Sequence, residues 1–227
     1  MESSLGSVTT TAQALLQSAC AGRVSLVVGT ETISGQPNTG QIAGHELVGH
    51  RLVGVMPSQP LVNIWIRITS KIVKYGFAIE YRDLEPPRTG IFDGLRLTLD
   101  PDVDFEMQCF ILVHLFGHSV QWVAPSLAAK LGPLQNTTDR EAFMKVLHDY
   151  EYEAARFGMQ LLHEAGIHDF DQWYADFVVT DWQYLERYYR EGAIPPWREC
   201  VATDQPLIQP EPIPPLEQKQ MEVRFAF

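Results

Sequence analysis

The middle of the chain shows two hydrophobic periods, one typical of a helix and one typical of strands. Apolar residues recur every three or four positions from Leu61 to Gly76, which predicts an amphipathic helix. Apolar and polar residues then alternate, which predicts a strand over Phe77 to Tyr81. We expect a second strand in IFDGLRLTL, with a tight turn or a bulge inside it at Asp93 and Gly94.

A longer helix is expected next, because LDPDVDFEMQCFILVHLFGHSVQWV begins with capping residues and continues as a mostly apolar run. The helix start is predicted at Asp100 or Asp102, and the helix should end near Val123. Since the run is apolar nearly all round, we expect this helix to pass through the core.

Two further helices are predicted in the C-terminal half. The first begins at a cap, Thr138 or Asp139, and stops near Gly166; the second ends at Gly192. This second helix carries many aromatic residues: Trp173, Tyr174, Phe177, Trp182, Tyr184, Tyr188 and Tyr189. They either pack against the domain or form a partner or dimer surface, with DWQYLERYYREG as the part expected to be exposed.

The two ends of the chain are less regular in pattern. A short helix is expected over Thr9 to Ala21 and a strand in RVSLVV, followed by the turn formers of GTETISGQPNTGQ. Beyond Pro195 the chain is rich in proline, which predicts an extended arm or a disordered tail. We therefore expect an N-terminal segment of uncertain structure at 1–60, a domain at 61–194 and an arm or tail at 195–227.

Composition and charge narrow the classes of function. With 17 basic and 28 acidic side chains, the net charge is -11, which argues against direct binding to nucleic acid. The three cysteines lie far apart, so neither a disulfide framework nor a thiolate zinc site is indicated. We find no signal-peptide pattern and no apolar run of membrane-spanning length, so we expect a cytoplasmic protein that does not enter membranes.

The candidate chemistry lies in VHLFGHSVQW, where His114 and His118 are four residues apart in the long apolar helix. Residues at this spacing share a helix face, so both imidazoles can reach one metal ion. The alternative is that both histidines are packed or hydrogen-bonded core residues. Two other segments, HELVGH and HEAGIH, have histidines five apart, and such residues do not share a helix face.

Three segments in a fixed order resemble the ImmA/IrrE family of zinc metallopeptidases. GIFDGLRLTLDPD is similar to the strand before the family's active-site helix, VHLFGHSVQW to its HELGH helix, and YEYEAARFGMQLL to its E-x-E-A-N-x-F-A helix. This chain departs from the last pattern at Ala155 and Gly158. The resemblance implies an α+β, zincin-like core, with a small β-sheet packed on a helical metal-site bundle that binds Zn²⁺.

The resemblance also implies which residues bind the metal. His114 and His118 match the family's histidine ligands, and Glu153 is assigned as the third ligand, with Glu151 as the reserve choice. The main departure is Leu115, because the family has at this position a glutamate that transfers a proton from the metal-bound water. Leucine cannot transfer a proton, so no catalytic residue is assigned here. Loss of a general base typically lowers a rate by about 10²–10⁴.

These features predict a metal-binding pseudoenzyme or a regulatory protein-interaction module without standard peptidase activity. Related proteins often act on transcriptional repressors, so the resemblance implies a regulatory context and a protein partner. A homodimer through the aromatic helix is a further expectation. Two alternatives remain open: an active zinc hydrolase with an unusual general base, and a metal-free structural module.

Overall fold

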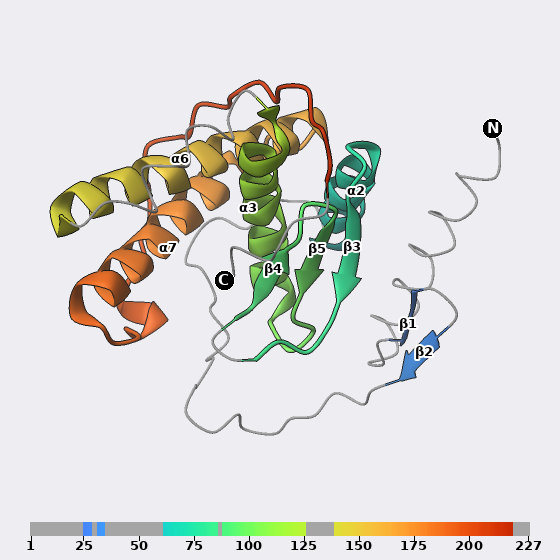
Figure 1. Ribbon diagram of the computed structural model, residues 1–227, viewed down its shortest axis with the longest axis horizontal. Coiled ribbons are helices and arrows are strands. Elements are labelled where there is room, and N and C mark those ends of the chain that lie inside the picture. The colour runs from blue at the N-terminus through green and yellow to red at the C-terminus, as the bar shows by residue number, and fades with distance from the viewer. Residues whose placement is uncertain (1–24, 29–30, 35–60, 86–87, 126–138, 220–227) are drawn as a thin grey trace. The chain divides into compact units, whose positions relative to one another are not determined.

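The computed structural model describes residues 25–28, 31–34, 61–85, 88–125 and 139–219 (Figure 1). The chain divides into two compact units, Met1–His50 and Arg51–Phe227. In the first unit, β1 (Ser25–Val28) and β2 (Glu31–Ser34) pair antiparallel. The strand expected in RVSLVV is therefore confirmed, whereas β2 occupies a segment in which only turn residues were expected. The helix expected over 9–21 lies outside the described residues.

The second unit is an α+β structure, as expected, and its described part contains four α-helices and a three-stranded sheet. The first helix, α2 (Leu61–Lys74), matches the amphipathic pattern. Ile64, Ile68 and Ile72, at spacings of four residues, are fully buried and belong to the hydrophobic core. The apolar stripe therefore faces the interior, as its period predicts.

The sheet contains three short strands in the order β3-β5-β4. β3 (Ala78–Tyr81) pairs parallel with β5 (Arg96–Leu99), and β4 (Gly90–Phe92) pairs antiparallel with β5. The segment IFDGLRLTL is thus a hairpin, and of the two alternatives expected at Asp93 and Gly94 the tight turn is confirmed. The Asp93 carboxylate accepts hydrogen bonds from the backbone amides of Leu95 and Arg96, and Gly94 adopts φ +88°.

The central helix α3 (Phe105–Val123) begins later than expected. Its cap is Asp104, whose carboxylate accepts a hydrogen bond from the backbone N–H of Met107 at 3.0 Å. The prediction of Asp100 or Asp102 as the helix start was therefore wrong: Asp100 instead accepts hydrogen bonds from two loop amides. Every residue at 108–123 is buried, so the expected passage through the core is confirmed.

Two long helices pack beside α3 (Figure 1). α6 (Arg140–Glu164) is capped by Asp139, one of the two caps expected, and is followed by Gly166 at φ +71°. α7 (Asp171–Glu191) ends at Gly192 in the left-handed conformation, as expected. No helix in the described ranges is long and apolar enough to cross a membrane.

The proline-rich segment forms an extended arm over the helices, shown in red in Figure 1. Its backbone amides donate to Asp176 of α7 (from Gln205, 2.9 Å) and to the carbonyl oxygen of Val123 at the end of α3 (from Glu217, 3.0 Å). Ile208 is buried within the core. Up to residue 219, the extended-arm alternative therefore holds.

Candidate metal centre

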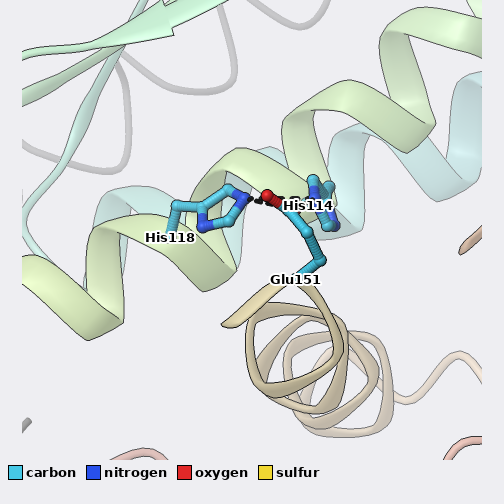
Figure 2. A group of neighbouring side chains, drawn as sticks. All are labelled: His114, His118 and Glu151. Carbon is cyan, nitrogen blue, oxygen red and sulfur yellow. Dashed lines mark hydrogen bonds and ion pairs between the residues drawn. The ribbon is translucent and has the colours of Figure 1, made fainter. Parts of the chain in front are cut away.

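Two helices bring three candidate metal ligands together (Figure 2). His114 and His118 project from successive turns of α3, and Glu151 projects from α6. The two helices can approach closely at Gly117, because a Cβ atom there would overlap the carbonyl group of Ala154. A glycine between the two histidines therefore sets the helix separation at the level of the site.

The ligand atoms converge on one point. The Glu151 Oε2 atom lies 2.9 Å from His114 Nε2 and 3.1 Å from His118 Nε2, and the two Nε2 atoms are 3.1 Å apart. In a tetrahedral site with metal–ligand bonds of about 2.0 Å, neighbouring ligand atoms are about 3.3 Å apart. The observed triangle is only slightly smaller, so the donor set fits a small divalent cation.

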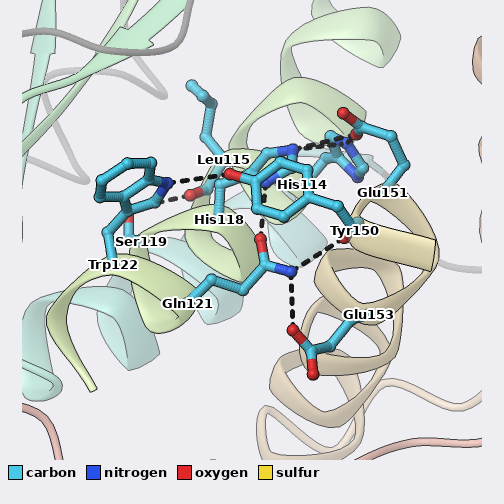
Figure 3. A network of polar contacts seen from close by, with 9 residues as sticks. All are labelled: His114, Leu115, His118, Ser119, Gln121, Trp122, Tyr150, Glu151 and Glu153. Atoms are coloured by element: carbon cyan, nitrogen blue, oxygen red, sulfur yellow. Dashed lines mark hydrogen bonds and ion pairs between the residues drawn. The ribbon is translucent and has the colours of Figure 1, made fainter. Parts of the chain in front are cut away.

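Glu151, rather than Glu153, completes this group. Among the described residues, His114, His118 and Glu151 form the group of potential ligand atoms that lie within 4.8 Å of one another. The Glu153 carboxylate accepts a hydrogen bond from the Gln121 side chain at 3.0 Å instead (Figure 3). Residues two apart on a helix point in directions about 200° apart, so one carboxylate faces the histidines and the other does not. The geometry therefore favours the reserve choice.

Burial and mutual contacts set the charges of the group. Burial alone would raise the pKa of Glu151, but its contacts with His118 and His114 outweigh this and lower it to about 2. Burial lowers the pKa of His114 below its ordinary value, against the opposing hydrogen bond to Glu151. An anionic carboxylate beside a neutral imidazole is the ligand state that a metal requires.

Aromatic rings hold the two imidazoles in place. The Phe110 ring stacks on His114 at a centroid distance of 5.5 Å, and Tyr150 stacks on His118 at 4.7 Å. Phe110 is in turn stacked on Phe177 of α7 at 4.5 Å. These contacts restrict the ring planes and surround the polar atoms with apolar surface, which strengthens electrostatic interactions at the site.

Leu115 lies on a different side of α3 from the three ligand atoms (Figure 3). It is fully buried, and its Cδ1 atom would be 2.8 Å from a Cβ atom built on Gly90 of β4. Leucine at this position therefore packs on the sheet. It has no group that could accept a proton.

A fourth titratable residue, Asp181 of α7, interacts electrostatically with this site. Burial raises the pKa of Asp181 well above its ordinary value, and the nearby Glu151 carboxylate raises it further. Sequence reasoning missed Asp181, Gln121 and Tyr150, because none of the three belongs to a ligand motif. Gln121 follows His118 by three residues on α3, a spacing that could have indicated it, whereas the packing of α6 against α3 brings Tyr150 to His118.

Only one of the other two histidine segments lies in the described residues. HELVGH lies outside the described residues. In HEAGIH, the His163 and His168 rings are 4.5 Å apart, although histidines five apart were not expected to share a helix face. They meet because α6 ends at Glu164 and the chain reverses at Gly166. His163 bonds to Asp171 at 2.9 Å.

Comparison of this chain with protein-family models, curated proteins and solved structures finds no significant match. The resemblance to the ImmA/IrrE family therefore rests on the three sequence motifs.

Proposed function

We propose that this protein binds one zinc ion through His114, His118 and Glu151 in a zincin-like core, and that it acts as a regulatory pseudoenzyme without standard peptidase activity. The observation that carries this proposal is the convergence of two imidazole nitrogens and one carboxylate oxygen, each within 3.1 Å of the others. Two packed helices supply these atoms.

The chemistry of the donor set supports zinc over the common hard cations. Two imidazoles and one carboxylate are typical of zinc sites, whereas Mg²⁺ and Ca²⁺ prefer oxygen ligands. The site is also nearly closed to water, since His118 is 0% and His114 2% exposed. The Glu151 carboxylate would offset one of the two positive charges of a bound zinc ion, which lowers the cost of burying that ion.

Leu115 supports the absence of ordinary proteolysis. A bound zinc ion supplies Lewis-acid chemistry and lowers the pKa of water. In the related enzymes, a glutamate at the position of Leu115 accepts and returns the proton. Here that position holds a buried leucine against β4, so this proton transfer has no acceptor in the helix. The chain therefore retains the proposed metal ligands and lacks the glutamate that would accept and return the proton.

The test measures metal content and peptide cleavage separately. We expect the purified protein to contain about one zinc per chain by mass spectrometry of the metal, and to cleave no peptide in a generic library. Peptide cleavage by the wild-type protein that a chelator abolishes would contradict the pseudoenzyme and favour an active hydrolase. Protein without zinc, even after incubation with excess zinc and dialysis, would refute the metal-binding proposal and leave a metal-free module.

The C-terminal end of α7 supports the interaction part of the proposal. Tyr188 and Tyr189 are 41% and 43% exposed, and Ile194 beyond the helix is 42% exposed. Exposed tyrosines are common at binding surfaces, so we propose this end as the partner or homodimer surface. Sedimentation of the wild type and of a Tyr188→Ala/Tyr189→Ala variant tests the homodimer; a concentration-independent monomer would remove it.

A further inference from the structure

The side chain of Gln121 connects the candidate metal centre to the residue first assigned as its third ligand (Figure 3). Gln121 is fully buried on α3, one turn beyond His118. Its amide nitrogen donates to the Tyr150 carbonyl oxygen at 2.9 Å and to the Glu153 carboxylate at 3.0 Å. Its Oε1 atom lies 2.9 Å from His118 Nδ1.

The orientation of this amide follows from its partners. The carbonyl oxygen of Tyr150 can only accept a hydrogen bond, and an ionised Glu153 carboxylate can also only accept. A flipped Gln121 amide would place its own oxygen against both acceptors and leave buried groups unsatisfied. The nitrogen therefore faces α6, and the oxygen faces His118.

This orientation determines the protonation of His118. The Oε1 atom of Gln121 can only accept, so the Nδ1 atom of His118 must carry the hydrogen of that bond. In a neutral imidazole with a protonated Nδ1, the Nε2 atom has no hydrogen and offers a lone pair. That Nε2 atom is the one that faces Glu151 and His114, at 3.1 Å from each.

We propose that Gln121 and Glu153 are positioning residues that hold His118 in the Nδ1–H tautomer and so present its Nε2 lone pair to a divalent cation. This inference rests on the metal site proposed above. It also gives the two glutamates of YEYEA separate tasks: Glu151 contacts the histidines, and Glu153 holds the amide that orients one of them. Tyr150, the residue before Glu151, contributes the stacked ring and the carbonyl oxygen.

The first test removes the acceptor without changing the size of the side chain much. Gln121→Leu and Gln121→Met should weaken Zn²⁺ binding about 10- to 100-fold in a chelator competition, the usual effect of losing a partner of a ligating histidine. Gln160→Leu is the matched control, because Gln160 lies on α6 and donates only to the exposed Glu164. The Zn²⁺ affinity of Gln160→Leu should stay within about twofold of the wild type, a much smaller change than the loss expected of the Gln121 variants. Equal affinities of folded Gln121→Leu, Gln121→Met and wild-type proteins would overturn the proposal.

The second test exchanges the two partners. Gln121→Glu alone places a carboxylate beside Glu153 and the Tyr150 carbonyl, so Zn²⁺ affinity or folding should suffer. In Gln121→Glu/Glu153→Gln, the new carboxylate can still accept from His118, and the new amide can donate back to it. We expect the double variant to bind Zn²⁺ more tightly than Gln121→Glu alone and to melt at a higher temperature. A double variant that is no better than the single one would contradict the proposed chain of hydrogen bonds.

The third measurement locates the ring hydrogens of His118 directly in the metal-free protein. Long-range ¹H–¹⁵N correlation spectra show which ring nitrogens carry a hydrogen, and we expect a hydrogen on Nδ1 of His118 in the wild type and in Gln160→Leu. Gln121→Leu should lose this preference. A wild-type His118 with the Nε2–H tautomer would refute the inference even if zinc binds. Absence of zinc binding together with the Nδ1–H tautomer would instead refute the proposed function and leave the positioning contact intact.

Discussion

Two clusters among the described residues contain two histidines and a carboxylate, and one of them forms a candidate metal centre. His114, His118 and Glu151 lie between two packed helices, where both imidazoles are almost fully buried. His163, His168 and Asp171 lie where α6 ends and α7 begins, and the side chains of His163 and Asp171 are 24% and 25% exposed. Of these two clusters, only the first has three ligand atoms within 4.8 Å of one another.

The comparison shows that the residue types do not make the site by themselves. In the first cluster, rigid helices, stacked rings and Gln121 direct the nitrogen atoms to a common point. In the second, a carboxylate binds one imidazole at the surface, where water screens the interaction. Preorganised direction and exclusion of water are therefore the features that distinguish a candidate metal centre.

The largest expected effect is a difference in Zn²⁺ affinity between variants of the two clusters. His118→Ala removes one of three ligands, so Zn²⁺ affinity should fall by more than the roughly 100-fold typical of losing an outer partner. His168→Ala should leave Zn²⁺ affinity unchanged. Isothermal titration with Zn²⁺ on both variants measures the difference. Similar losses in both would mean that the two clusters do not differ as proposed.

A smaller effect is expected from the helix contact that positions the first cluster. Gly117→Ala places a methyl group against the backbone of Ala154, which cannot rotate away, so the free energy of unfolding should fall by about 1–3 kcal/mol. Urea denaturation measures this change. Gly192→Asn is the control, since no atom lies within 4 Å of a Cβ at Gly192 and asparagine tolerates its left-handed backbone. Equal stabilities of Gly117→Ala and wild type would argue against close packing of α3 on α6.

The buried cluster should also make the metal-free protein sensitive to acid. The pKa of Glu151, about 2, lies below its ordinary value of 4.5, so its stabilising contribution is present above pH 4.5 and is lost as the pH falls toward 2. The pKa of His114 is also lowered from its ordinary value of 6.5. Below pH 6.5 the unfolded chain therefore binds more protons than the folded protein, so the free energy of unfolding again decreases as the pH falls.

This acid sensitivity can be measured by urea denaturation in the presence of a chelator at several pH values between 7 and 3. We expect the free energy of unfolding to decrease on acidification by an amount on the order of 1–3 kcal/mol from these groups. The Glu151→Gln variant should lose part of this dependence. An unchanged pH profile in that variant would show that Glu151 is not held ionised by the two histidines.

The sequence predicted the elements better than their ends and pairings. The apolar periods located α2, α3, α6 and α7 because each helix buries a continuous stripe or its whole circumference. The predicted start of α3 was wrong because three aspartates precede the helix. Capping depends on which of them faces the first free backbone amides. The sequence left open whether Gly94 forms a tight turn or a bulge, because the two look alike in sequence.

By itself, the sequence determined the class of elements, the histidine pair on one face of a buried helix, and the absence of a carboxylate at Leu115, because spacing along one helix is a local property. Tertiary structure placed Glu151, and not Glu153, beside the two histidines and brought the Tyr150 ring onto His118. That placement depends on the rotation of α6 against α3. Contacts between helices set this rotation, and no spacing within either helix encodes it.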